Sequence, residues 1–261
     1  MDSIELRQDQ LLLKQAQNEK DKKSILSNLK SFKNKKFILI GLGGVGSNCA
    51  ELLVRSGCTN LVLIDADIIE VHNLGRQNYT CEQINIFKTT ALEKNLLKID
   101  PKAKIQVLNE YLKCKNYEQK LLDVINVNLK NIVIIDCSDN LDTRNLINSF
   151  CLKYNIDWMY SGGEGFESIC ALFTYSKNSN INSYNKLITL NHTQSANCST
   201  GVLNSTTLIT ASLIVKELLL HCCLIQNQNM ISSNIDNGGN NNKVKCIKFN
   251  SLHNSIFEFY I

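Results

Sequence analysis

The chain contains no pair of cysteines spaced as CxxC and no pair of histidines four residues apart, although it has 11 cysteines and four histidines. Those spacings are the usual sequence signs of a structural zinc site, so we expect no zinc. The cysteine count is odd, and several cysteines lie within apolar runs. We therefore expect most of them to be buried thiols in a reducing compartment, the cytoplasm, and not a disulfide framework.

Long apolar runs, a secretory signal and a strong charge are also missing. No apolar run reaches the roughly 18 residues that a membrane span needs, so we expect a soluble protein with no membrane partner. The first ten residues, MDSIELRQDQ, are polar and acidic, unlike a secretory signal. The net charge is only +4, and much of it comes from lysines between Lys20 and Lys36. We interpret these lysines as the solvated face of a helix and not as a nucleic-acid surface.

A glycine-rich loop lies between an apolar run and a helical pattern near the start of the chain. Phe37–Ile40 predicts a buried strand, and Ser47–Ser56 predicts a helix. The glycines between them are Gly41, Gly43, Gly44 and Gly46. Glycines let the backbone approach a phosphate, and a helix N-terminus offers free N–H groups. A second apolar run, Asn60–Ile64, ends in Asp65, which is placed to hold ribose hydroxyls. Together these features predict a nucleotide site.

Polar residues follow where a dinucleotide site would continue with a crossover helix. They are Asp67, Asn73, Arg76, Gln77 and Lys88. Attack of a carboxylate on the α-phosphate of ATP brings two anions together, so it needs cations and a metal beside the leaving pyrophosphate. Arg76 and Lys88 can supply the cations.

A second acidic segment, IDCSDN, follows the apolar run Asn131–Ile135. Ligands bind at the carboxyl ends of the strands in open α/β sheets. Asp139, at such a strand end, could hold Mg²⁺, and Asp136 is the competing carboxylate.

These motifs occur together, in order, in a known family. The chain resembles the ThiF/MoeB/HesA-type adenylyltransferases, which are relatives of the ubiquitin-activating enzymes. That family has a GxGGxG loop, an Asp at the end of the next strand, NLxRQ, a Lys about a dozen residues on, and C-[ST]-D-N. The matching segments here are GLGGVG at Gly41–Gly46, Asp65, NLGRQ at Asn73–Gln77, Lys88 and CSDN at Cys137–Asn140. The resemblance covers residues 36–261, with a weaker match upstream.

The resemblance implies a role for each matching residue. The four glycines would approach the phosphates, and Asp65 would bind the ribose. Asn73, Arg76 and Lys88 would act on the triphosphate. Asp139, in preference to Asp136, would coordinate Mg²⁺, with Asn140 beside it in the nucleotide site. The implied cofactors are therefore ATP and Mg²⁺.

The resemblance also implies a reaction and partners. Family members activate the C-terminal glycine carboxylate of a small ubiquitin-like protein as an acyl-adenylate. The best candidate here is a sulfur carrier of the thiamine or molybdopterin type that ends in Gly-Gly. A sulfur donor protein is a further partner. Many members are homodimers in which an N-terminal arginine reaches the partner's ATP, and Arg7 is the candidate here. Cys198, in SANCSTGVLN, is the candidate thiol for linkage to the carrier, and a passive thiol is the alternative.

Three other functions remain open. The nearest is a zinc-free relative that adenylates and dehydrates threonylcarbamoyl-adenosine in tRNA, the one case with a nucleic-acid partner. The SGGEG segment and the missing CxxC pairs support it, whereas NLGRQ and the Cys198 loop favour the carrier enzyme. A dehydrogenase would leave Arg76, Lys88 and Asp139 without a use. A non-catalytic subunit of an activating enzyme typically lacks such residues.

The order of the patterns predicts one α/β domain with a Rossmann-like, mostly parallel sheet, flanking helices and a C-terminal antiparallel extension. Within it we expect an N-terminal helical extension (1–35), a nucleotide-binding core (36–175), an irregular crossover loop (176–202) and a closing part (203–261). The expected helices are Glu5–Lys30, Lys88–Ile99, Leu141–Tyr154 and Leu203–Cys223. The expected further strands are Lys104–Leu108, Ile156–Tyr160, Ile169–Tyr175, Val244–Asn250 and Ser255–Tyr260. SGGEG is expected to be a flexible turn, and the Asn-rich 226–242 a disordered loop.

Overall fold

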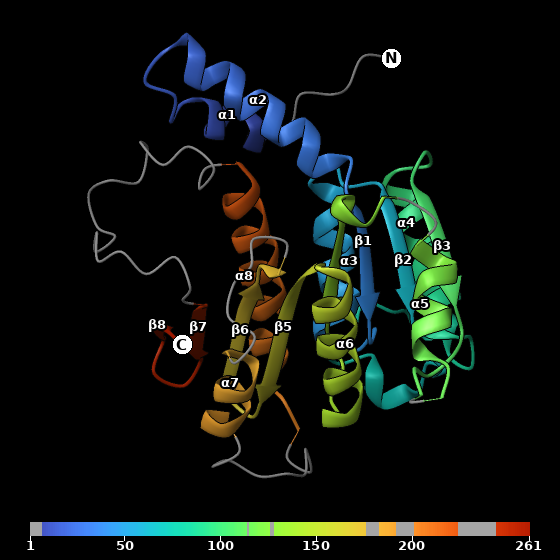
Figure 1. The fold of residues 1–261 in the computed structure, drawn as a ribbon. Coiled ribbons are helices and arrows are strands. Elements are labelled where there is room, and N and C mark those ends of the chain that lie inside the picture. Colours follow the sequence, from blue (N-terminus) through green and yellow to red (C-terminus); the bar gives the residue numbers. More distant parts are fainter. Residues whose placement is uncertain (1–6, 114, 126–127, 176–182, 192–200, 224–243) are drawn as a thin grey trace.

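One eight-stranded sheet forms the centre of the computed structural model (Figure 1), which describes residues 7–113, 115–125, 128–175, 183–191, 201–223 and 244–261. The strand order is β3-β2-β1-β4-β5-β6-β7-β8. The first five strands in this order are parallel, and β6, β7 and β8 pair antiparallel. The strands are β1 (Lys36–Ile40), β2 (Asn60–Ile64), β3 (Lys104–Leu108), β4 (Ile132–Asp136), β5 (Asp157–Glu164), β6 (Glu167–Phe173), β7 (Lys245–Asn250) and β8 (Ser255–Tyr260). The predicted fold class is confirmed.

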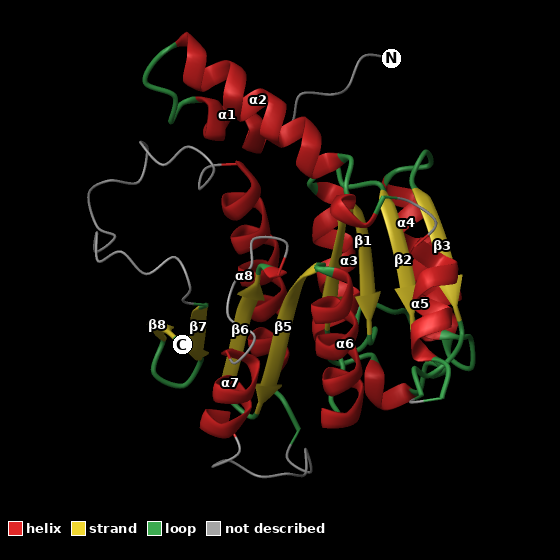
Figure 2. Cartoon of the chain, viewed as in Figure 1, coloured by secondary structure: helices red, strands yellow, loops and turns green. Residues whose placement is uncertain are grey.

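Helices cover both faces of the sheet, because successive residues of a strand point to opposite faces. Phe37 and Leu39 of β1 belong to the core beneath α3 (Gly44–Arg55), α4 (Lys88–Ile99) and α8 (Asn204–Cys223). Ile38 and Ile40 belong to the core beneath α5 (Tyr117–Ile125), α6 (Leu141–Tyr154) and α7 (Ser183–Asn191). Figure 2 shows the helices on both sides of the strands. Short 3₁₀ turns, η1 (Val71–Asn73), η2 (Cys81–Gln83) and η3 (Leu129–Asn131), lie in the connections. The central strands are therefore buried on both faces.

Helix α8 has the length and composition of a membrane span, with a mean hydropathy of 1.4 over its most apolar window, although no apolar run of that length was expected from the sequence. More than half of its most apolar window, 56%, is buried within the fold. It packs against α3, α2 (Glu19–Lys33) and β6. Its apolar character therefore has an explanation within the core of the molecule.

The single N-terminal helix predicted at Glu5–Lys30 is wrong. The segment forms two helices, α1 (Arg7–Leu13) and α2, because Asn18 caps α2 by accepting a 2.9 Å hydrogen bond from the Asp21 N–H. A partly buried ion pair between Lys33 and Asp9, 2.5 Å long, holds α1 against α2. The leucines of this segment are not all buried, since Leu11 and Leu26 are exposed.

The flexible turn predicted at SGGEG is also wrong. Most of that segment extends β5, which pairs with β6 as far as Glu164 opposite Glu167. The turn itself is at Gly165, whose φ is +57°. The segment before α8 holds this turn, because the Gly165 N–H donates to Gly201 O and the Leu203 N–H donates to Gly165 O, both at 3.1 Å. Hydrogen bonds from the segment before α8 thus order a glycine-rich stretch whose composition alone would predict flexibility.

The expected irregular crossover loop contains helix α7, in which Tyr184 and Leu187 are buried. Helix α5 was not predicted, and α3 begins at Gly44, three residues before the predicted Ser47. The rest of the crossover segment and the Asn-rich 226–242 lie outside the described residues.

Candidate nucleotide site

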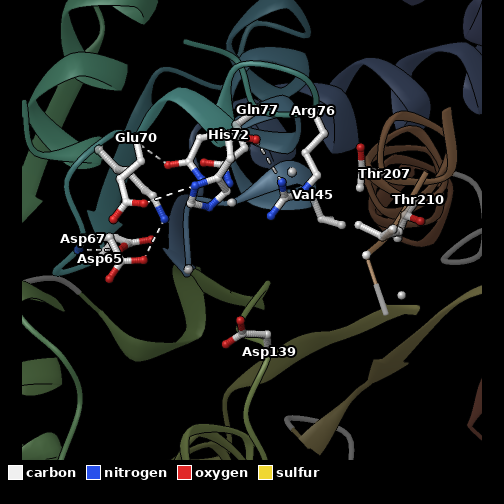
Figure 3. Close-up of a pocket in the computed structure, with 18 of the residues that line it drawn as sticks. Val45, Asp65, Asp67, Glu70, His72, Arg76, Gln77, Asp139, Thr207 and Thr210 are labelled. Carbon is white, nitrogen blue, oxygen red and sulfur yellow. Dashed lines mark hydrogen bonds and ion pairs between the residues drawn. The ribbon is translucent and has the colours of Figure 1, made fainter. Parts of the chain in front are cut away.

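A cavity of about 620 Å³ lies at the carboxyl ends of the central parallel strands. Figure 3 shows many of its side chains. The glycine loop after β1, the segments after β2 and β4, the end of β5 and the first turns of α8 all contribute to the wall. The lining residues are Gly41, Gly43, Gly44, Val45, Asp65, Ala66, Asp67, Ile68, Glu70, His72, Asn73, Arg76, Gln77, Lys88, Asp139, Gly163, Gly201, Val202, Thr207 and Thr210. Most of the polar residues singled out in the sequence therefore meet in one place.

The glycine loop brings a bare helix N-terminus to the cavity. Helix α3 has Gly43 as its N-cap, and within the part of the chain that the structure describes no side chain caps it, so its first N–H groups can bind an anion. Gly41 has a φ of +87°, and a Cβ there would lie 2.6 Å from Cys137 O. A Cβ on Gly44 would lie 2.8 Å from Thr207 Cγ2. This loop is thus shaped so that α3 and α8 both approach the same space.

Gly46 differs from the other three glycines because it does not line the cavity. A Cβ on Gly46 would lie 1.9 Å from Gly41 O. Its visible function is to let α3 pack onto the glycine loop. Its predicted approach to the phosphates stays a prediction.

Asp65 lines the cavity and ties two loops together. Its Oδ2 accepts a 2.6 Å hydrogen bond from the Leu42 N–H, and its Oδ1 accepts a 2.8 Å bond from the Asp67 N–H. Burial raises the pKa of the Asp65 carboxyl, and the charge of Lys88 opposes that rise. Each carboxylate oxygen keeps a further lone pair, so these bonds leave room for a ribose hydroxyl.

Lys88 lines the cavity as a paired cation. Its side chain is 8% exposed, and its Nζ lies 2.7 Å from Asp67 Oδ2. The Tyr111 hydroxyl donates to the other oxygen of Asp67. Burial opposes ionisation of Asp67, but the hydrogen bonds from Lys88 and Tyr111 outweigh it and lower the pKa of Asp67. Lys88 therefore brings little uncompensated charge to the cavity.

Arg76 is the less constrained cation. Its Nη1 donates a 3.3 Å hydrogen bond to His72 O, and it forms no ion pair within the described residues. The Arg76 carbonyl contacts the first turn of α3 through Asn48 Nδ2 at 3.4 Å. The guanidinium is therefore available to an anion close to the helix N-terminus.

Asn73 helps to form the turn that carries these residues. Its Oδ1 accepts a 2.9 Å hydrogen bond from the Glu70 N–H, and the Glu70 side chain accepts from the Asn73 N–H. This capping box fixes η1. Asn73 is buried yet lines the cavity, so a role on the triphosphate stays a prediction.

The segment after β4 separates its carboxylates. Asp139 is exposed, and Figure 3 shows it apart from the other labelled side chains, across the cavity from His72 and Arg76. Asp136 is fully buried, does not line the cavity, and lies 3.5 Å from Arg144 Nε. Burial raises the pKa of the Asp136 carboxyl, and Arg144 offsets part of that rise. Of these two, only Asp139 can meet a metal in the cavity.

Asn140 does not line the cavity. It is the N-cap of α6, and its Oδ1 accepts a 2.8 Å hydrogen bond from the Thr143 N–H. Its predicted contact with nucleotide has no counterpart in the described geometry and stays a prediction.

The polar side chains that line the cavity fit a nucleotide better than a metal ion alone. Gln77 Oε1 is buried and has no hydrogen-bond partner among the described residues, so it can accept from a ligand. No group of three or more His, Cys, Asp or Glu side chains that could hold a metal occurs within the described ranges. Mg²⁺ commonly binds through one or two carboxylates plus phosphate oxygens. Asp139 would therefore hold Mg²⁺ together with the phosphates of bound ATP.

Sequence reasoning missed several wall residues. Thr207 and Thr210, three residues apart on α8, share one helix face, and that spacing was the available signal. Gly163, Glu70 and His72 belonged to no motif. Arg7 is the first residue of α1, but its side chain is not among those described, and Cys198 lies outside the described residues.

Comparisons with known proteins place these features in a family context. The family model that matches is that of the ThiF family, over residues 10–259. Ubiquitin-like modifier-activating enzyme 5 of Dictyostelium discoideum is 33% identical over 150 residues, which is 54% of this chain and 38% of that protein. The enzyme of the same name from Caenorhabditis briggsae is 31% identical over 142 residues, 53% of this chain and 33% of that protein.

Solved structures show the same fold. E. coli MccB with ATP has a TM-score of 0.67 at 19% identity, covering 90% of this chain and 66% of that chain. PaaA has a TM-score of 0.66 at 16% identity, with 90% and 67% covered. The match spans only about a third of the length of these curated relatives, 38% and 33% respectively.

Proposed function

We propose, from the premise that the chain belongs to the ThiF family, that it is an ATP-dependent adenylyltransferase acting on a C-terminal carboxylate. The observation that carries this proposal is the cavity itself. Free helix N–H groups, Arg76 and Lys88 line the same space as Asp139. A hydride-transfer site would have no use for that set of charges.

The reaction joins two anions, and the wall residues suit its charge changes. A carboxylate oxygen bonds to the α-phosphorus of ATP while the bond to the β-phosphate oxygen breaks, and pyrophosphate leaves with the electron pair. The α3 N-terminus and Arg76 stabilise the negative charge on the phosphates. Asp65 holds the ribose, and Asp139 holds Mg²⁺, which supplies charge neutralisation on the leaving group.

The proposed substrate is a ubiquitin-like protein. Support comes from the curated relatives, which are named ubiquitin-like modifier-activating enzymes, and from the solved complexes of MccB with MccA. The narrower proposal is a sulfur carrier ending in Gly-Gly, of the thiamine or molybdopterin type. It rests on the NLGRQ motif and on Cys198, and it implies a sulfur donor protein as a further partner.

Pyrophosphate exchange tests the proposal. Labelled pyrophosphate should enter ATP only when Mg²⁺ and a ubiquitin-like protein with a free C-terminal Gly-Gly are both present. The same protein without its last glycine is the matched control and should give none. Exchange that ignores every such protein but responds to threonylcarbamoyl-modified tRNA would move the assignment to the dehydratase. Reduction of NAD would overturn both.

Cys198 is tested by a separate step. Adenylation needs cations and Mg²⁺, whereas transfer of sulfur or of the acyl group needs an ionisable thiol. Cys198→Ser should therefore leave pyrophosphate exchange unchanged and remove any carrier-linked species seen by mass spectrometry. Full thiocarboxylate formation by the variant would show that the thiol is passive.

A further inference from the structure

The cavity wall carries more carboxylates than permanent cations. Its acidic residues are Asp65, Asp67, Glu70 and Asp139, and its permanent cations are Arg76 and Lys88. Lys88 is already paired with Asp67 at 2.7 Å. Arg76 and the α3 N-terminus are therefore the main unpaired positive groups that a triphosphate would meet at this wall. A further positive group beside Arg76 would reduce the excess of carboxylates.

His72 lies where such a group is needed. It belongs to η1 and lines the cavity, and Arg76 Nη1 donates to its carbonyl oxygen at 3.3 Å. The Arg76 carbonyl in turn contacts Asn48 in the first turn of α3. Figure 3 shows the His72 ring with Glu70 on one side and Arg76 on the other. Because the hydrogen bond from Arg76 uses the backbone oxygen of His72, it ties the η1 turn, and not the ring itself, to Arg76 and α3.

Glu70 fixes the direction of the ring. Its Oε2 lies 3.1 Å from His72 Nδ1. The Glu70 carboxylate is itself held by the Asn73 N–H in the capping box. Because the two imidazole nitrogens are on different edges of the ring, Nε2 remains for a ligand. Glu70 therefore acts as a positioning residue for His72.

We propose that protonated His72, oriented by Glu70, is a third cation of the site and binds the pyrophosphate end of ATP through its Nε2–H. This role rests on the proposed function, because it assumes that ATP occupies the cavity. Asp65 marks the ribose end, whereas His72 is tied to Arg76 and α3 at the phosphate end. Histidines exchange their proton between about pH 5 and pH 8. ATP should therefore bind more tightly as the pH falls through that range.

Other charged groups from the neighbouring segments line the same cavity as His72. They are Glu70 on its own turn, Arg76 after it, Asp67 after β2, Lys88 on α4 and Asp139 after β4. Carboxylates, lysines and arginines ordinarily keep their charge above about pH 6. Asp65 is different, because burial raises its pKa. Comparison of variants at His72 therefore shows whether a pH dependence of ATP binding comes from His72 or from Asp65.

Calorimetric titration of the full chain with Mg·ATP, and with AMP, at about pH 6 and about pH 8.5 tests the proposal. The unsubstituted chain should bind ATP about five- to tenfold more tightly at the lower pH, the effect of one partly exposed charge-assisted hydrogen bond. His72→Gln should lose that gain, and His72→Lys should bind tightly at both pH values. Glu70→Gln should show a smaller gain. AMP, which has no pyrophosphate, should show none.

His253→Gln is the matched control, since His253 is exposed on the β7–β8 turn and does not line the cavity. It should keep the pH-dependent gain. Unfolding midpoints without ligand should agree for the His72 variants, because that side chain is 64% exposed. If His72→Gln keeps the affinity and the pH dependence of the parent, the role of His72 is refuted while ATP binding stands. If the parent binds no ATP at either pH, the proposed function and the role of His72 both fail.

Discussion

At the scale of single residues, burial separates side chains that the sequence presents as equals. Asp136 and Asp139 stand three residues apart after β4. Asp136 Oδ1 accepts from both the Ser138 N–H and the Ser138 hydroxyl, at 2.9 and 2.6 Å, and Arg144 lies beside it. Asp139 is exposed on the wall of the cavity. The first therefore holds the loop in shape, and the second is free to meet a ligand.

Arg76→Ala and Asp139→Ala should each disable adenylation without unfolding the protein. Loss of one electrostatic contact to a transition state typically costs about 100-fold or more in rate. Pyrophosphate exchange measures the loss, and thermal unfolding checks the fold. Arg55→Ala is the matched control, because Arg55 is an exposed residue on α3 whose ion-pair partner among the described residues is Glu51. Exchange near the parent rate in either site variant would show that the site is placed wrongly.

Asp136 gives a prediction for stability against pH. Burial raises its pKa above the ordinary 3.8, and Arg144 offsets that rise in part. The native state therefore holds this proton more tightly than the unfolded chain does. The contribution of protonated Asp136 to the free energy of unfolding is fully present below pH 3.8 and is lost as the pH rises through the raised pKa. The free energy of unfolding of the parent, minus that of Asp136→Asn, should therefore fall with rising pH above 3.8. Denaturant titrations that show a rising difference would contradict this.

At the scale of elements, Asn140, which was predicted to contact the nucleotide, has a structural role at the start of a helix. Asn140 caps α6 through the Thr143 N–H. Asn140→Ala should cost about 1 kcal/mol in the free energy of unfolding, whereas Asn140→Asp and Asn140→Ser should keep most of the cap. Denaturant unfolding measures this. If Asn140 also binds nucleotide, Asn140→Ser will keep the stability and lose ATP affinity in calorimetry, which would restore the original assignment.

The packing of α3 on the glycine loop gives a second prediction at this scale. A Cβ on Gly46 would lie 1.9 Å from the backbone oxygen of Gly41, which cannot rotate away as a side chain can. Gly46→Ala should therefore destabilise the protein by about 3 kcal/mol, at the upper end for overpacking. Gly75→Ala is the matched control, because no atom of the described residues lies within 4 Å of its added Cβ. Equal stability of the two variants would mean that α3 is free to shift.

Sequence patterns predicted correctly the helices and strands whose first and last residues are set by neighbouring residues in the sequence. The predicted bounds of β2, β3, α4 and α6 agree with the structure. Sequence patterns failed where contacts with residues far away in the sequence determine the local structure. Pairing with β6 orders Gly163 and Glu164 in β5. The next residue, Gly165, donates to Gly201 O and accepts from the Leu203 N–H, about 40 residues away. The break between α1 and α2 was a local signal that was missed, because Asn18 is a good N-cap.

At the scale of the whole molecule, the sheet order explains why the site could be predicted in part. Strand β1 lies between β2 and β4, so the chain leaves it in one direction and returns on its other side. Loops that follow these strands diverge there and leave a crevice at the carboxyl ends. Residues such as Asp65 and Asp139 follow those strands directly, so a motif could place them. Thr207 comes from α8, far along the chain, and only the folded arrangement brings it to Gly44.

The proposed homodimer with Arg7 acting across it is also a prediction about the whole molecule. Arg7 begins α1, which packs on α2 and not on the cavity. If Arg7 acts in the ATP site of a partner subunit, Arg7→Ala will inactivate the partner's site and Asp139→Ala will inactivate the subunit's own site. Each variant alone will therefore form an inactive homodimer. Co-expressed together, they should form mixed dimers in which one subunit keeps Asp139 and receives Arg7 from its partner.

Random pairing of the two variants would place about half of the molecules in mixed dimers, each with one complete site. Pyrophosphate exchange should then return to about a quarter of the parent rate per subunit, because a complete site needs both side chains. Sedimentation must show a dimer in the same preparation. Arg55→Ala co-expressed with Asp139→Ala is the control, and about half of the parent rate is expected there, since the Arg55 variant keeps its own site. Exchange that stays absent in the Arg7 mixture, with dimers present, would show that Arg7 does not act across the interface.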